Sequence, residues 1–144
     1  MNKHAALPEI RQRLDEAITY SSREQAFEIA AEGLKAAEAA GLKGEIEYFK
    51  GQFELLNENY ATAIDHFKAA IKNNPLDGGS YNDLALCLAE AGLIDEALSC
   101  FDKGISVESD YATIHHNKGW LLNNIGRHKE AIDCFNKALG LEPE

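Results

Sequence analysis

An alanine and a phenylalanine four residues apart recur three times along this chain, each time 34 residues after the previous pair. The pairs are Ala63 with Phe67, Ala97 with Phe101 and Ala131 with Phe135, and two further positions keep the interval, at Ala70, Gly104 and Ala138 and at Ile64, Leu98 and Ile132. A fixed period of this length is the signature of a chain built from stacked structural repeats. Each repeat must then bury its apolar face against its neighbours.

Each copy contains two amphipathic segments separated by a short polar or glycine-containing turn, at 57–59, 91–92 and 125–127. The alternation of apolar and polar residues that is typical of strands is missing, while Leu, Ala, Ile and Glu are plentiful. We therefore predict an all-α fold made of antiparallel helix pairs. In the second helix of a pair, the small alanine allows close approach and the phenylalanine fills the space on the same face. Pro75 and Pro143 mark where such helices end.

This 34-residue period, with its small–aromatic pair and late proline, resembles the tetratricopeptide repeat. Residues 44–77, 78–111 and 112–144 match that pattern as three copies. Gly51, Ala85 and Gly119 stand where the family often has glycine, and Glu47, Tyr81 and His115 replace its early tryptophan. The resemblance implies a right-handed α-solenoid.

Residues 1–43 match the repeat less closely. Ser22 followed by Gln25 is typical of a capping box, and it predicts a helix from there towards Gly41. A preceding helix is expected from about Pro8 to Thr19. We interpret this pair as a degenerate fourth repeat that caps the N-terminal end of a single solenoid domain.

The charge of the chain limits its possible partners. The formal net charge is −10, which argues against nucleic acid, because phosphate backbones require clustered Lys and Arg. Between residues 44 and 111, four lysines stand against thirteen carboxylates. This stretch either favours a partner with basic residues or is simply a solvated acidic surface. No apolar run reaches the length of a signal peptide or a membrane span, so the sequence predicts a cytoplasmic protein outside the membrane.

The residues give no candidate for catalysis, a cofactor or a metal. His66, Cys100 and Cys134 share one place in the repeat. Equivalent places in stacked repeats lie about 8 to 10 Å apart, whereas zinc ligands lie about 2.0 to 2.3 Å from one ion. The phosphate-binding loops and HExxH patterns of enzymes do not occur. We therefore predict a protein that is not an enzyme.

The resemblance implies a concave groove, lined by the first helix of each repeat, that holds an extended peptide or a helix of a partner. Placed by register, the predicted groove residues are Tyr48, Phe49, Gln52, Asn82, Asp83, Leu86, His116, Asn117, Trp120, Asn123 and Asn124. On a helical wheel, Trp120 falls outside the apolar stripe of its helix. It either anchors a partner or fills the gap between repeats. The asparagines either pair with a peptide backbone or are solvated polar residues.

One activity of the family is excluded by charge. Some members grip the C-terminal carboxylates of heat-shock chaperones with Lys, Asn and Arg on their first helices. The matching positions here are Tyr48, Gln52, Asp83, Thr113 and Asn117, with no Lys or Arg among them. Because Asp83 would repel a carboxylate, we predict that this chain has no such clamp.

Three hypotheses for function follow. The first is an adaptor that binds a partner protein in the groove. The second is a scaffold that assembles into homo-oligomers, because no later segment covers the last helix, and Ile132, Phe135 and Leu139 would form the contact. The third is a chaperone that shields an aggregation-prone client.

Overall fold

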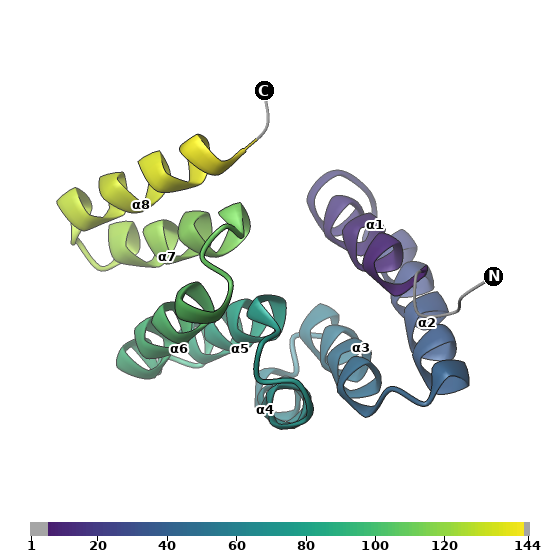
Figure 1. Ribbon diagram of the computed structural model, residues 1–144. Coiled ribbons are helices and arrows are strands. Elements are labelled where there is room, and N and C mark those ends of the chain that lie inside the picture. The colour runs from purple at the N-terminus through teal and green to yellow at the C-terminus, as the bar shows by residue number, and fades with distance from the viewer. Residues whose placement is uncertain (1–5, 143–144) are drawn as a thin grey trace. The chain divides into compact units, whose positions relative to one another are not determined.

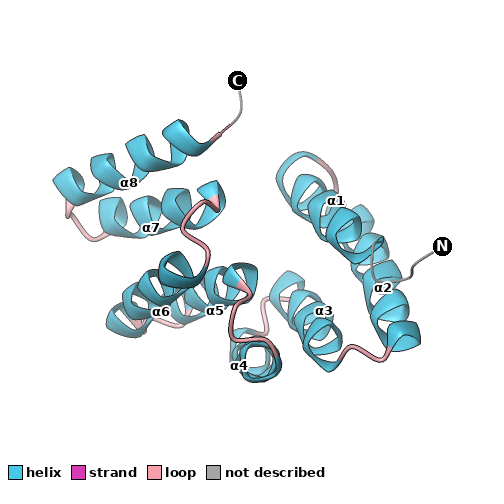
Figure 2. Ribbon diagram, in the orientation of Figure 1, coloured by secondary structure: helices cyan, strands magenta, loops and turns pink. Residues whose placement is uncertain are grey.

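The computed structural model describes residues 6–142, so Pro143 lies outside the described residues. Within them the chain forms helices joined by short loops, and no strand occurs in this part (Figure 2). The helices are α1 (Ala6–Tyr20), α2 (Arg23–Ala40), α3 (Lys43–Leu56), α4 (Tyr60–Asn73), α5 (Gly78–Glu90), α6 (Ile94–Val107), α7 (Ala112–Asn124) and α8 (His128–Leu141). The predicted all-α fold is confirmed.

The chain divides into two compact units, each of which holds four of these helices. Figure 1 labels the helices in their order along the chain. The N-terminal unit is Met1–Asn73 and contains α1 to α4, whereas the C-terminal unit is Asn74–Glu144 and contains α5 to α8. In the N-terminal unit α1 pairs with α2, α2 packs on α3, and α3 pairs with α4. In the C-terminal unit α5 pairs with α6, α6 contacts α7, α7 pairs with α8, and α5 lies beside α7.

The repeated phenylalanine and glycine positions explain how the helices of a pair approach each other. Phe67 is fully buried, and a Cβ atom placed on Gly51 would lie 2.7 Å from its ring. The same geometry recurs in the last pair, where a Cβ on Gly119 would lie 2.9 Å from the ring of Phe135. The first helix of these pairs thus keeps glycine where the aromatic ring of the second helix rests on its backbone.

The helix ends follow the local sequence. The Ser22 hydroxyl accepts a hydrogen bond from the Gln25 backbone N–H at 3.1 Å, which confirms the predicted start of α2. Gly41 ends α2 in the left-handed conformation, with φ of 69°. The preceding helix begins at Ala6 and runs to Tyr20, slightly beyond the predicted limits on both sides.

Candidate functional site

The exposed side of α7 is a polar stripe with a tryptophan at its centre. His116, Trp120, Asn123 and Asn124 are exposed and Asn117 is half-buried. Because successive helical residues are about 100° apart, these five residues lie on one side of the helix. The opposite side carries the buried residues Ile114, Leu121 and Leu122. Trp120 is 40% exposed, so its indole does face away from the core as the wheel predicted.

A matching stripe lies on α5, one repeat earlier, and two asparagines join the stripes. Asp83 and Leu86 are half-buried there and Asn82 is buried. The Asn117 amide Nδ2 donates to Asn82 Oδ1 at 3.0 Å, and Asn82 Nδ2 donates to Asp83 Oδ1 at 3.1 Å. The side chains of two helices therefore form one hydrogen-bonded chain that runs from Asn117 through Asn82 to the Asp83 carboxylate. We call the surface formed by Asp83, Leu86, His116, Asn117, Trp120, Asn123 and Asn124 the α5/α7 face.

The electrostatic environment of the α5/α7 face is negative. Lys118 is the one Lys or Arg within α5 and α7, and its ammonium group pairs with Asp102 of α6 at 2.7 Å. Burial raises the pKa of the Cys87 thiol on α5 to about 12, and the negative charges of Asp83 and Glu90 add to that rise. A thiol with such a pKa stays neutral at physiological pH, so Cys87 serves as a buried apolar residue and not as a nucleophile.

Two residues at the edge of the α5/α7 face also take part in packing against α8. The His116 and Phe135 rings lie with their centroids 5.5 Å apart, and His128 Nδ1 lies 2.8 Å from Asn123 Oδ1. Phe135 is half-buried because it packs on His116 and Gly119. Phe135 therefore takes part in the packing between α7 and α8, and its place in a contact for self-association stays a prediction.

The other two residues predicted for self-association are exposed on α8. Ile132 is 56% exposed and Leu139 is 68% exposed. One repeat earlier, the equivalent residues Leu98 and Ile105 are half-buried, in a helix that α7 contacts. The difference arises because none of the described helices of the C-terminal unit follows α8.

The predicted groove residues of α3 are not on an open surface. Tyr48 is 2% exposed, and Phe49 and Gln52 are also buried. The Arg11 guanidinium lies 3.7 Å from the centroid of the Tyr48 ring, and a Cβ on Gly33 would lie 2.2 Å from the Phe49 ring. Placing Tyr48 and Phe49 on an open surface by register was wrong, because Arg11 of α1 lies over the Tyr48 ring and the backbone of α2 at Gly33 packs against the Phe49 ring. Asn82 was likewise predicted on the surface, but it is buried by its place in the amide chain.

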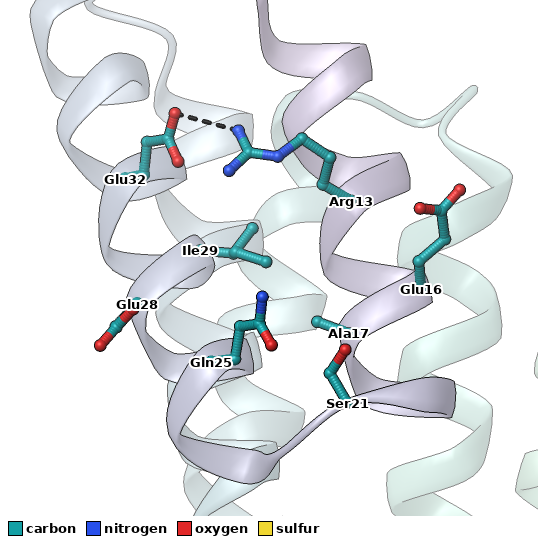
Figure 3. Close-up of a pocket in the computed structure, with 8 residues that line it drawn as sticks. All are labelled: Arg13, Glu16, Ala17, Ser21, Gln25, Glu28, Ile29 and Glu32. Atoms are coloured by element: carbon teal, nitrogen blue, oxygen red, sulfur yellow. Dashed lines mark hydrogen bonds and ion pairs between the residues drawn. The ribbon is translucent and has the colours of Figure 1, made fainter.

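A shallow groove that sequence reasoning missed lies between α1 and α2 (Figure 3). Ala17 and Ile29 form part of its lining, and Arg13 pairs with Glu32 at 3.1 Å. Its full lining is Arg13, Glu16, Ala17, Ser21, Gln25, Glu28, Ile29 and Glu32. Isolated charged residues on a helix surface carry no sequence signal that would have marked this groove.

Metal-binding clusters and membrane spans do not occur within residues 6–142. In this range no group of three or more His, Cys, Asp or Glu side chains is placed to hold a metal ion. Each of the helices there is also too short or too polar to cross a membrane.

The sequence and the fold both resemble known proteins. Two family models described as tetratricopeptide repeat match residues 50–106 and 112–144, which together make up more than half of the chain. A peroxisomal targeting signal receptor of Kluyveromyces lactis is 28% identical over 97 residues, which are 67% of this chain and 17% of the receptor. The chain thus spans about a sixth of the length of that relative.

Solved structures share the fold at lower identity. The crystal structure of MamA has a TM-score of 0.65 and 21% identity, covering 94% of this chain and 77% of that chain. The first tetratricopeptide-repeat domain of Spaghetti, bound to the HSP90 peptide SRMEEVD, has a TM-score of 0.67 and 19% identity, covering 71% of this chain and 81% of that chain. With two family models on the sequence and these folds alongside the eight helices, the chain belongs to the tetratricopeptide-repeat family.

Proposed function

We propose that this protein is an adaptor that holds a segment of a partner protein on the α5/α7 face, without catalysis or a cofactor. The observation that carries the proposal is the exposed indole of Trp120, which lies in the centre of a polar stripe. Tryptophan combines a large apolar area with one N–H donor, and it is enriched among residues that dominate binding energy.

The amide groups beside Trp120 suit the backbone of an extended peptide. An asparagine side chain both donates and accepts hydrogen bonds, so it can pair with peptide groups whatever side chains they carry. The hydrogen bond to Asn82 already orders the Asn117 side chain in the free protein. Binding of a peptide therefore costs less side-chain conformational entropy at Asn117. Asn124 is exposed on the same stripe.

Proteins with this fold support the proposal. The similar domain of Spaghetti is bound to a peptide of HSP90, and the relative from Kluyveromyces lactis is named a receptor for a targeting signal. A helical repeat of this kind is therefore suited to holding short segments of other proteins.

Selection of random peptides tests this function without knowledge of the partner. Twelve-residue peptides displayed on phage would be selected on the full chain, and the affinities of single peptides would then be measured by fluorescence anisotropy. We expect Trp120→Ala to weaken their binding by about tenfold or more, since anchoring aromatic residues typically contribute over 1 kcal/mol. Tyr20→Ala is the matched control, because Tyr20 is 85% exposed and lies on α1 in the other unit.

Comparison of Trp120→Ala with Tyr20→Ala also shows whether the peptides bind on the α5/α7 face or on another surface. If Trp120→Ala has the same far-ultraviolet circular dichroism spectrum as the original chain, its loss of peptide binding is not caused by a loss of folding. If the selection yields no peptide, or if the peptides bind Trp120→Ala as well as the original chain, the proposed function is wrong.

A second candidate function is self-assembly through α8. The exposed Ile132 and Leu139 favour it, because α7 contacts the helix that carries the equivalent residues one repeat earlier. A helix from a second copy would cover α8 in the same way. Such a head-to-tail contact produces rings or filaments.

A further inference from the structure

An exposed side of α8 repeats a side of α6 that another helix covers. Four exposed residues share this side of α8, because helical residues three, four and seven positions apart lie on one face. We call them the α8 ridge: Lys129, Ile132, Asn136 and Leu139. The residues 34 positions earlier, on α6, are Asp95, Leu98, Asp102 and Ile105. Because Asp102 pairs with Lys118 of α7, that side of α6 is the one on which α7 packs.

The side of α6 that faces α7 meets positive charge there. The Lys118 ammonium group lies 2.7 Å from the Asp102 carboxylate. At the start of α8, the pKa of Arg127 is raised by its hydrogen bond with Glu130 and by the charge of Glu130, and further by the charges of Asp95 and Asp102. The pair formed by α7 and α8 thus receives α6 with cations opposite its carboxylates.

The α8 ridge has the opposite sign. Lys129 stands in place of Asp95, and Asn136 in place of Asp102, so one positive charge replaces two negative ones. The ion pairs found within residues 6–142 do not include Lys129. Opposite charges across an interface favour association, whereas like charges oppose it. A surface that receives α8 as α7 receives α6 is therefore expected to be negative.

The groove between α1 and α2 has that sign, and we call it the α1/α2 groove. Glu16 and Glu28 lie at its two sides, while Arg13 pairs with Glu32 across it (Figure 3). One cation therefore stands against three carboxylates. Between the two helices, Ile29 supplies apolar lining. The α1/α2 groove thus combines an apolar strip with a net negative charge.

The α1/α2 groove lies on the side of its helix pair that faces away from α3. On α1, Glu16 lies about 140° around the helix from Arg11, which contacts α3. On α2, Glu28 lies about 140° around the helix from Gly33, which packs against α3. A further helix can therefore reach the groove without displacing α3.

We infer that the α8 ridge of one copy docks in the α1/α2 groove of a second copy, with Ile132 and Leu139 over Ile29 and Lys129 beside the groove carboxylates. This inference rests on the proposed self-assembly through α8 and adds the site that receives α8. The contact joins two different surfaces, so a bound copy still has one of them available for the next copy.

Mixtures of two variants of the full chain test this pairing, with the mass measured by light scattering behind size-exclusion chromatography. The ridge variant is Ile132→Glu with Leu139→Glu, and its groove is unchanged. The groove variant is Glu16→Lys with Glu28→Lys, and its ridge is unchanged. The original chain and each variant alone would be measured across a wide range of concentrations, followed by the two variants in equal amounts.

A matched control separates the groove from the overall charge. Glu38→Lys with Asp65→Lys reverses the same number of charges, on exposed residues of the N-terminal unit that do not line the groove. This control should associate as the original chain does. The groove variant should associate about tenfold more weakly or less, because like charges then face each other across the contact.

The mixture should form pairs of two chains and nothing larger, because only the ridge of the groove variant and the groove of the ridge variant are then intact. Addition of Lys129→Glu to the groove variant should restore association, since the charges on both sides of the contact are exchanged. A variant that had merely lost its fold would not regain association in this way.

The outcomes separate this inference from the proposed functions. A groove variant that associates as tightly as the original chain, or a mixture that forms no pairs, would overturn the inference and leave self-assembly through another contact of α8. A mass of one chain for the original protein at every concentration would remove both self-assembly and the inference. The adaptor function on the α5/α7 face would stand in either case.

Discussion

At the scale of single residues, the contact between Gly33 and Phe49 is tighter than the one between Gly51 and Phe67. A Cβ on Gly33 would lie 2.2 Å from the Phe49 ring, which is fully buried and has little room to move. Alanine is the better helix former by about 1 kcal/mol, but overpacking of a core costs about 1 to 3 kcal/mol. The steric clash with the Phe49 ring should therefore determine how a substitution of Gly33 changes the stability of the chain.

We predict that Gly33→Ala lowers the free energy of unfolding by about 1 to 2 kcal/mol, because the clash outweighs the gain in helix propensity. Urea denaturation followed by circular dichroism measures this change. Gly140→Ala is the control, since a Cβ there has no heavy atom within 4 Å and only the propensity acts. A Gly33→Ala variant as stable as Gly140→Ala would contradict the packing described for α2 and α3.

The same residues show how far the sequence could identify the site. The exposure of Trp120 was predictable, because it depends on the period of one helix. The burial of Tyr48 and Phe49 was not, because it depends on Arg11 and Gly33, which lie in helices outside the clear repeats. The bond between Asn117 and Asn82 was also beyond prediction, since register places the two asparagines on neighbouring helices without fixing their rotamers.

At the scale of helices and turns, three successive pairs connect through a residue in the left-handed conformation. Gly92 and Gly126 have φ of 84° and 86°, and Glu58, at the equivalent place of the first of these pairs, has φ of 61°. The left-handed region costs a residue with a Cβ roughly 1 to 2 kcal/mol, which glycine avoids. The loop between α3 and α4 is thus less favourable than its two counterparts.

Glu58→Gly should raise the free energy of unfolding by about 0.5 to 1 kcal/mol, because the relief of backbone strain exceeds the added entropy of the unfolded chain. Gly92→Ala should lower it by about 1 kcal/mol, since nothing lies within 4 Å of its Cβ and only the backbone responds. Thermal and urea denaturation of the two variants would check the opposite signs. A destabilised Glu58→Gly would mean that the Glu58 side chain contributes more than the turn conformation.

The boundaries of helices were predictable where side chains set them. Ser22 begins α2 through its bond to the Gln25 amide, and this signal is local. The extension of α1 to Tyr20 has no such signal: its last residues are exposed, and the backbone bond from Ser21 N–H to the Ala17 carbonyl continues the helical pattern there. The same limit applies throughout the N-terminal helix pair, which lacks the spacing of the other repeats.

At the scale of the whole molecule, the exposed apolar side chains Ile132 and Leu139 of α8 allow the proposed self-assembly to be tested. If self-assembly through α8 operates, the mass measured by light scattering behind size-exclusion chromatography should rise with concentration. The double variant Ile132→Glu with Leu139→Glu should then keep the mass of one chain, because two charges on the contact would have to be buried. Leu76→Glu is the control, as Leu76 is exposed in the loop before α5.

A mass that stays at one chain across all concentrations would remove self-assembly and leave the α5/α7 face as the functional surface. Association that persists in the double variant would place the contact elsewhere.

The family fold was predictable at this scale, because a 34-residue period leaves few alternatives. The association state was not, since it depends on surface residues that the period does not constrain.

The amide chain from Asn117 through Asn82 to Asp83 has one more consequence. Hydrogen bonds in series polarise one another, so a donor that approaches Asn117 Oδ1 makes the Nδ2 of the same amide a stronger donor to Asn82. That change passes on to the bond with Asp83. A partner that donates a hydrogen bond to Asn117 Oδ1 would therefore strengthen the bond between Asn117 and Asn82 and the bond between Asn82 and Asp83 together. Loss of either asparagine side chain would weaken the remaining hydrogen bonds of this chain.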